Sequence, residues 1–171
     1  MSEADWTMTA TQLEFASPLW PPAPVRDPRR DVAAHDGDTL RQGDAALQLY
    51  ITPGHTMGTL SPVVEVKAGG KTHRAIIWGG TGFNFGRDFR RLDAYIESTE
   101  RMRKVVREQQ VDVLLSNHPS YDGTAAKLAA MRTRGGDAAN PYVVGTDAVL
   151  RALTVAGECA RANRARFEML P

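Results

Sequence analysis

The sequence predicts an α/β fold with one sheet that is covered by helices on one face. Three observations predict it. Four segments have the short apolar or alternating pattern of strands, and longer segments repeat apolar residues at the spacing of a helix. Their order along the chain is strand, strand, strand, helix, strand, helix, helix. The length of 171 residues suits about one domain. No further element remains to cover the other face of this sheet.

The expected strands are short and are separated by turn residues. Residues 46–52 alternate between apolar and polar side chains, and residues 59–67 are rich in valine. Gly69 and Gly70 then predict a hairpin turn into a strand over 73–78. The apolar run 111–116 is typical of a buried strand.

The clearest helix is predicted over 92–110, where apolar residues recur at steps of three and four and charged residues take the other side. Shorter helices are expected over 2–11, 124–132 and 147–164. Side chains that can cap these helices precede or begin them: Ser2, Asp122 and Thr146.

Residues 16–30 contain five of the ten prolines, which excludes a regular helix or a central strand. We interpret this segment as an extended linker. Residues 1–30 are therefore expected to be the end of a preceding unit plus the linker, and residues 31–171 the main body. The turn signal Asp36-Gly37-Asp38 opens that body.

Composition limits the classes of partner. Apolar residues make up 42% of the chain and charged residues 24%, as in a soluble globular protein, and the net charge is +1. Such a balance predicts neither a nucleic-acid nor a membrane partner. Arginine-rich stretches at 26–30, 87–107 and 161–166 are better read as solvated surfaces. The acidic N-terminus does not resemble a signal peptide, so we expect a cytoplasmic protein, or a periplasmic or secreted one if Met1 is not the natural start.

Cys159 is the one cysteine of the chain, so neither an internal disulfide nor a multi-cysteine zinc cluster can form. We expect it to be a small buried residue of the last helix rather than a nucleophile.

Two histidines stand in turns that follow expected strands, in the segments Thr52-Pro53-Gly54-His55-Thr56-Met57-Gly58 and Ser116-Asn117-His118-Pro119. An imidazole at the end of a strand is well placed to bind a metal together with ligands from neighbouring loops. His55 and His118 are therefore the predicted metal ligands. The alternative is that each only satisfies hydrogen bonds of its loop. His35 and His73 are expected to be solvent-facing or structural.

These segments resemble the C-terminal half of the metallo-β-lactamase superfamily. The resemblance rests on Asp36-Gly37-Asp38-Thr39-Leu40, on the His55 and His118 segments, and on the strand that leads into Gly79-Gly80-Thr81. It is greatest for the class B lactamase subclass whose zinc ligands are histidines and an aspartate, without cysteine. It covers about residues 31–160, and residues 2–11 look like the end of the N-terminal half.

The resemblance implies an αββα sandwich that holds one or two zinc ions in a groove, where a zinc-bound water attacks a β-lactam or a related amide or ester. By resemblance, His55 completes a three-histidine zinc site and His118 completes the second site. Thr81, Asn84 and Tyr121 would line the groove for a small-molecule substrate.

The hallmark His-x-His-x-Asp-His cluster of the family is missing, since no two of the four histidines lie two positions apart. The position directly after Trp78, where many relatives with two metal ions have an aspartate, is occupied by Gly79. This agrees with the lactamase-like branch and not with the glyoxalase-like branch.

The first hypothesis is that the chain is an incomplete C-terminal portion of a zinc hydrolase, which is inactive alone and pairs with an N-terminal segment. The alternative is an inactive truncated relative that acts as a binding or oligomerisation module, for example as a homodimer. A third reading is an unrelated α/β domain with two coincidental histidines.

Overall fold

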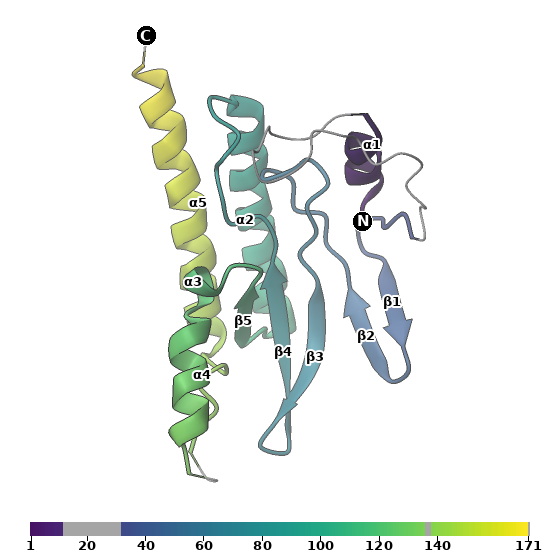
Figure 1. Cartoon of the computed structure of the whole chain (residues 1–171), viewed down its shortest axis with the longest axis vertical. Coiled ribbons are helices and arrows are strands. Elements are labelled where there is room, and N and C mark those ends of the chain that lie inside the picture. Colours follow the sequence, from purple (N-terminus) through teal and green to yellow (C-terminus); the bar gives the residue numbers. More distant parts are fainter. Residues whose placement is uncertain (12–31, 136–137, 171) are drawn as a thin grey trace.

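A computed structural model describes residues 1–11, 32–135 and 138–170 of the chain (Figure 1). The predicted linker over 16–30 lies outside these residues. The elements in chain order are α1 (Glu3–Thr11), β1 (Thr39–Gln42), β2 (Ala45–Gln48), β3 (Val63–Ala68), β4 (Lys71–Trp78), α2 (Phe89–Gln109), β5 (Val113–Ser116), α3 (Pro119–Asp122), α4 (Thr124–Thr133) and α5 (Thr146–Glu168). The four predicted strands and the predicted helices are thereby confirmed, with ends that differ by a few residues.

The five strands form one mixed sheet in the order β1-β2-β3-β4-β5. The first three pairings are antiparallel, and β4 pairs with β5 in parallel. Consequently β2, β4 and β5 run in the same direction, and the segments that follow these three strands leave the same edge of the sheet. This shared edge brings together loops that are far apart in the sequence.

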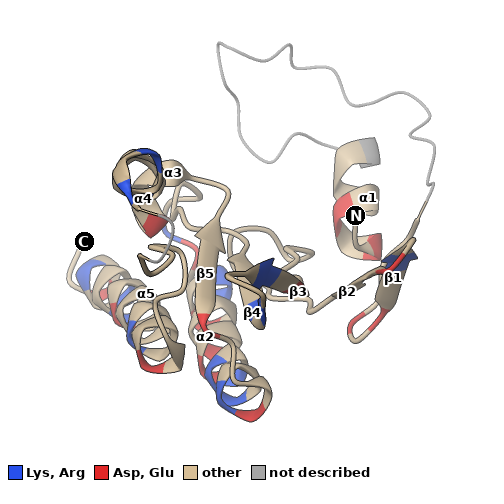
Figure 2. Cartoon of the chain, turned by 90° about the horizontal axis from the view of Figure 1, so that it is seen from below, with Lys and Arg blue, Asp and Glu red and all other residues tan. Residues whose placement is uncertain are grey.

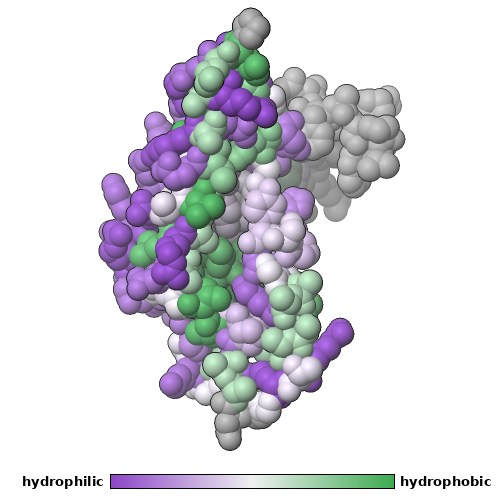
Figure 3. Space-filling view, turned by 90° about the vertical axis from the view of Figure 1, so that its left-hand side faces the viewer, coloured by the Kyte–Doolittle hydropathy of each residue, from purple (hydrophilic) through white to green (hydrophobic). Residues whose placement is uncertain are grey.

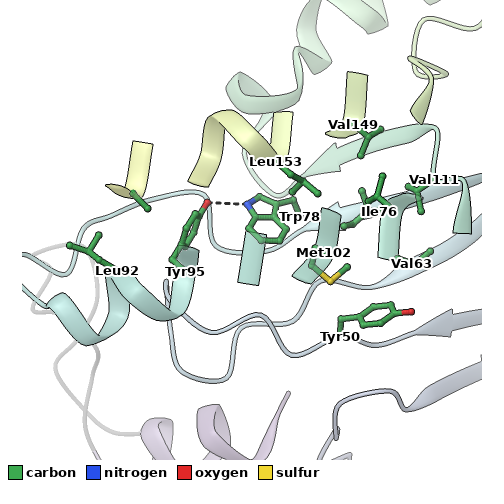
Figure 4. Packing of buried hydrophobic residues seen from close by; sticks show 12 residues of the cluster. Tyr50, Val63, Ile76, Trp78, Leu92, Tyr95, Met102, Val111, Val149 and Leu153 are labelled. Atoms are coloured by element: carbon green, nitrogen blue, oxygen red, sulfur yellow. Dashed lines mark hydrogen bonds between the residues drawn. The ribbon is translucent and has the colours of Figure 1, made fainter. Parts of the chain in front are cut away.

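Helices α2 and α5 cover one face of this sheet (Figure 2). Val63, Ile76 and Leu114 occupy one register row across β3, β4 and β5, and their side chains pack in the core beneath the two helices. The helices approach each other closely at Gly157, where an added Cβ would lie 2.6 Å from Thr99 Oγ1. Figure 4 shows the core between the helices and the sheet, with Trp78 Nε1 donating a hydrogen bond to the Tyr95 hydroxyl at 3.0 Å.

The opposite face of the sheet is also apolar. Val64, Ala75 and Val113 form its adjacent register row, and Ile77 pairs with Leu115 beyond them. Ala75 and Val113 are buried by their neighbours, while the other three are only half-buried. In Figure 2, α1 and α4 lie towards the two ends of the sheet on this side, and neither covers β3 and β4 between them.

Some local expectations are wrong. Strand β1 was not predicted, because all four of its residues are exposed and show no alternation. Thr146 is the first residue of α5 and does not cap it, since the N-cap position belongs to Gly145, which has no side chain to do so. Cys159 is exposed, because it lies on the side of α5 that faces away from the α2 contact at Gly157.

Among the described residues, no helix combines the length and the apolar character that crossing a bilayer requires.

Candidate functional site

Three loops leave the same edge of the sheet and contain the predicted site residues. The loop after β2 carries His55, the loop after β4 carries Gly80 and Gly82, and the turn after β5 carries His118. The three loops meet there because β2, β4 and β5 run in the same direction. Both predicted ligands therefore lie on one edge of the sheet.

The ring of His55 is oriented by the loop after β4. Its Nδ1 lies 2.9 Å from the carbonyl oxygen of Gly82. Because a carbonyl oxygen only accepts, Nδ1 carries a hydrogen, and in the neutral imidazole Nε2 then keeps a free lone pair. A backbone carbonyl that fixes the tautomer in this way is the usual outer partner of a metal-binding histidine. Gly80 permits the approach, since its φ is +72° and an added Cβ would lie 2.4 Å from the His55 Cβ.

Helix α1 holds the His55 loop from one side. Asp5 Oδ2 accepts a hydrogen bond from Thr56 Oγ1 at 3.0 Å, and Asp5 Oδ1 accepts one from the Gly58 backbone N–H at 3.1 Å. An added Cβ on Gly58 would lie 2.0 Å from Ser2 Oγ, so only glycine fits under this helix. The sequence assigned residues 2–11 to a preceding unit, but α1 contacts the main body directly at the candidate site.

Helix α2 holds the same loop from the other side. Ser98 Oγ donates to the Pro53 carbonyl oxygen at 2.9 Å, and Arg91 Nε donates to the Gly54 carbonyl oxygen at 3.0 Å. The two helices thus fix both ends of the turn that carries His55. Neither the Asp5 nor the Ser98 contact was predicted, because each joins residues that local sequence patterns cannot connect.

His118 is exposed and occupies the N-cap position of α3. Its backbone N–H donates to Ser116 Oγ at 3.1 Å, and its ring lies 6.1 Å from the Tyr121 ring between centroids. The imidazole has no hydrogen-bond partner among the described residues. Both ring nitrogens are therefore available to a ligand.

Asp122 stabilises the turn that follows His118, but the N-cap position of α4 belongs to Gly123 and not to Asp122, which the sequence predicted as the cap. Its Oδ1 accepts from the Thr124 N–H at 2.9 Å and from the Thr124 hydroxyl at 2.6 Å, and its Oδ2 accepts from the Ser116 N–H at 3.0 Å. Burial raises the pKa of Asp122, but these hydrogen bonds outweigh burial and hold the pKa below its ordinary value of 3.8. The carboxylate is thus already engaged by the protein.

The described residues do not assemble a complete metal site. No group of three or more His, Cys, Asp or Glu side chains that could hold a metal is found in this part of the chain. The orientation of His55 is compatible with its predicted role as one zinc ligand, and this role stays a prediction. His73 is engaged elsewhere, with Nδ1 2.6 Å from Asp112 Oδ2, and the side chain of His35 is largely exposed.

The predicted groove residues differ in their surroundings. Thr81 is buried, and its hydroxyl has no hydrogen-bond partner in the described part of the chain. Asn84 is exposed, and Tyr121 is 61% exposed. Thr81 and Tyr121 line one cavity, whereas Asn84 does not. Their predicted contact with a substrate stays a prediction.

Comparison with known proteins identifies the fold. No family model and no curated protein matches the sequence. Among solved structures, the chain is similar to the subclass B3 metallo-β-lactamase of Bradyrhizobium japonicum, with a TM-score of 0.69 and 24% identity over 81% of this chain and 52% of that one. The chain has part of the metallo-β-lactamase fold. A metallo-β-lactamase of Legionella gormanii gives a TM-score of 0.68 and 22% identity, with the same coverage of 81% and 52%.

A mutant metallo-β-lactamase of Cronobacter sakazakii aligns over 99% of this chain and 64% of its own length, with a TM-score of 0.69 and 24% identity. The chain thus spans about half to two thirds of the length of the metallo-β-lactamases that it matches. This agrees with the prediction of a partial domain, and identities this low establish the shared metallo-β-lactamase fold alone.

Proposed function

We propose that this chain forms part of the active site of a zinc-dependent hydrolase of the metallo-β-lactamase fold. The complete hydrolase would act on a β-lactam or a related amide or ester. His55 and His118 would be its zinc ligands, and the remaining ligands would come from residues outside this chain. The observation that carries the proposal is the hydrogen bond between His55 Nδ1 and the Gly82 carbonyl oxygen, which leaves Nε2 free at the edge that also carries His118.

The roles of the protein residues follow from the contacts. The Gly82 carbonyl fixes the tautomer of His55, while α1 and α2 hold its loop through Asp5 and Ser98. A zinc ion in a catalytic site lowers the pKa of its bound water to about 7 and so supplies a nucleophile. Because a catalytic zinc normally has three protein ligands, the chain alone is not expected to hydrolyse substrate. Thr81, Asn84 and Tyr121 are proposed to border the substrate.

The proposal is tested by completing the fold. The chain is co-expressed with the part of the Bradyrhizobium japonicum enzyme that it does not match, and hydrolysis of the chromogenic β-lactam nitrocefin is measured with zinc and with a chelator. We expect activity only from the pair and only with zinc. His55→Ala should abolish the activity, and the matched control His35→Ala, on the exposed surface, should retain it.

The assembled pair also reports zinc binding directly, by equilibrium dialysis and metal analysis. If the pair forms and binds zinc equally well with and without His55 and His118, the assignment of these ligands is wrong. Equal nitrocefin hydrolysis by the His55→Ala pair would contradict the proposal in the same way.

A second candidate function is a binding or oligomerisation module without catalysis. The observation that favours it is the half-buried state of three apolar residues, Val64, Ile77 and Leu115, on the sheet face opposite α2 and α5. Light scattering after size exclusion measures the mass. A dimer that Val64→Lys converts to a monomer would support this function, whereas a folded monomer at all concentrations would count against it.

A further inference from the structure

A cavity of about 660 Å³ lies between α5 and the loop that follows β4, and Thr81, Ser116 and Tyr121 are among its lining residues. Neither His55 nor His118 lines it. Its walls come from Trp78, Phe83 and Tyr95 on one side and from small or apolar residues of α5 on the other. Figure 3 views the molecule from the side of α5 and shows hydrophobic residues gathered along the middle of this face.

The aromatic wall is rigid. The rings of Trp78 and Tyr95 meet edge to face at 5.7 Å between centroids, and those of Phe83 and Tyr95 at 4.8 Å. Burial raises the pKa of Tyr95 to about 12, although the Trp78 hydrogen bond lowers it, so the phenol stays neutral at physiological pH. A wall of interlocked rings is the preformed apolar surface that small-molecule sites use.

The wall formed by α5 is long and leaves room. The cavity-lining residues of this helix extend from Ala152 to Arg166, which corresponds to about 21 Å at 1.5 Å per residue. Small side chains, Ala156 and Cys159 among them, face the cavity along this length. Val155 is 61% exposed, so apolar surface is accessible from the solvent.

One end of the cavity is cationic. Arg166 and Asn163 line it near the C-terminus of α5. Arg161 and Arg164 of the same helix form ion pairs with Glu100 and Asp93. The guanidinium of Arg166 forms no ion pair with any of the described carboxylates and lies over the Phe167 ring at 4.9 Å. The cavity thus combines a long apolar body with one uncompensated positive charge.

We propose that this cavity binds an elongated aliphatic carboxylate, a free fatty acid, with its chain along α5 and its carboxylate at Arg166. A hydrocarbon without an anionic group would leave the guanidinium unused, and a cationic amphiphile would be repelled by it. Burial of the chain against the aromatic wall drives binding, and a bidentate guanidinium pair orients the carboxylate. The site uses no metal. It shares Thr81 and Tyr121 with the proposed substrate groove, but binding of a fatty acid is measured separately from hydrolysis.

The test compares decanoate with 1-decanol, which has the same chain without the charge, by isothermal titration calorimetry on the 171-residue protein. Decanoate should bind with a single site and more tightly than decanol. Arg166→Gln should weaken decanoate binding about tenfold, the effect of losing a charge-assisted hydrogen bond, and leave decanol unchanged. Arg151→Gln on the exposed surface of the same helix is the matched control and should change neither.

Ala156→Phe tests the cavity itself, because it fills the space along α5 and should abolish binding of both ligands. If this variant loses its helical circular dichroism, Cys159→Leu provides the same block from a position that is exposed. Equal affinities of decanoate and decanol, or unchanged decanoate binding in Arg166→Gln, would overturn the proposal. So would chemical-shift changes on decanoate addition that map outside the cavity.

Discussion

The carboxylate of Asp5 accepts a hydrogen bond from the Thr56 hydroxyl at 3.0 Å, although the two residues are 51 positions apart in the sequence. The same carboxylate accepts the backbone N–H of Gly58. Both contacts flank His55 on its C-terminal side. Helix α1 is therefore part of the support of the candidate ligand.

Replacing Asp5 by alanine should destabilise the protein and loosen the His55 loop. Hydrogen bonds to a charged group contribute about 1.5–3 kcal/mol each, and partial exposure brings the expected loss of unfolding free energy to about 2 kcal/mol. Urea unfolding measures this loss. The control Asp44→Ala removes an exposed carboxylate from the β1–β2 turn and should change the unfolding free energy by less than about 0.5 kcal/mol.

Proton NMR of the His55 ring gives a second measurement for Asp5→Ala. The ring signals should broaden or shift in this variant and stay unchanged in Asp44→Ala. A variant as stable as the original protein, with the same His55 signals, would show that α1 does not support the loop.

The sequence predicted the His55 turn because its determinants are local. Pro53 and Gly54 are turn residues that stop the preceding extended segment, and such a turn is encoded by a few neighbouring residues. It could not predict that Asp5 and Ser98 fix this turn from two helices, because pairings over such separations have no local signature. The exposure of Cys159 was missed for a related reason: α5 has two apolar sides, and only the packing against α2 decides which one is buried.

Replacing Thr81 by valine should stabilise the protein. Thr81 is 5% exposed, and its hydroxyl finds no hydrogen-bond partner among residues 1–11, 32–135 and 138–170, so the folded state leaves a desolvated polar group unsatisfied. Valine has the same shape without this cost, and a gain of about 1 kcal/mol corresponds to a rise in Tm of about 2–4 °C. The control Thr99→Val removes a hydroxyl that donates to the Ile96 carbonyl at 2.7 Å and should lower Tm. A fall in Tm for both variants would show that the Thr81 hydroxyl is satisfied in solution.

The low pKa of Asp122 predicts a specific loss of stability in acid. Because the folded pKa lies below the unfolded value of about 3.9, the contribution of Asp122 is fully present above that value. It is lost as the pH falls from there through the folded pKa. Asp122→Asn should be less stable than the original protein at pH 6, and the difference should shrink towards pH 3 in urea unfolding. A difference for Asp122→Asn that stays constant between pH 6 and pH 3 would contradict the prediction.

Replacing Gly80 by alanine should disturb the candidate site more than the same change in a free turn. Gly80 and Gly70 have nearly equal φ values of +72° and +74°, so both substitutions carry a similar backbone strain of about 1–2 kcal/mol. An added Cβ at Gly70 meets nothing within 4 Å, whereas at Gly80 it would lie 2.4 Å from the His55 Cβ. Gly80→Ala must therefore move His55 away from the Gly82 carbonyl, and we expect a larger loss of unfolding free energy than in Gly70→Ala. The nitrogen-15 chemical shifts of the His55 ring report which ring nitrogen carries the hydrogen. They should change in Gly80→Ala and stay the same in Gly70→Ala. Equal losses of stability with an unchanged tautomer in both variants would refute the close packing of these two loops, and with it the structural basis for assigning His55 as a metal ligand.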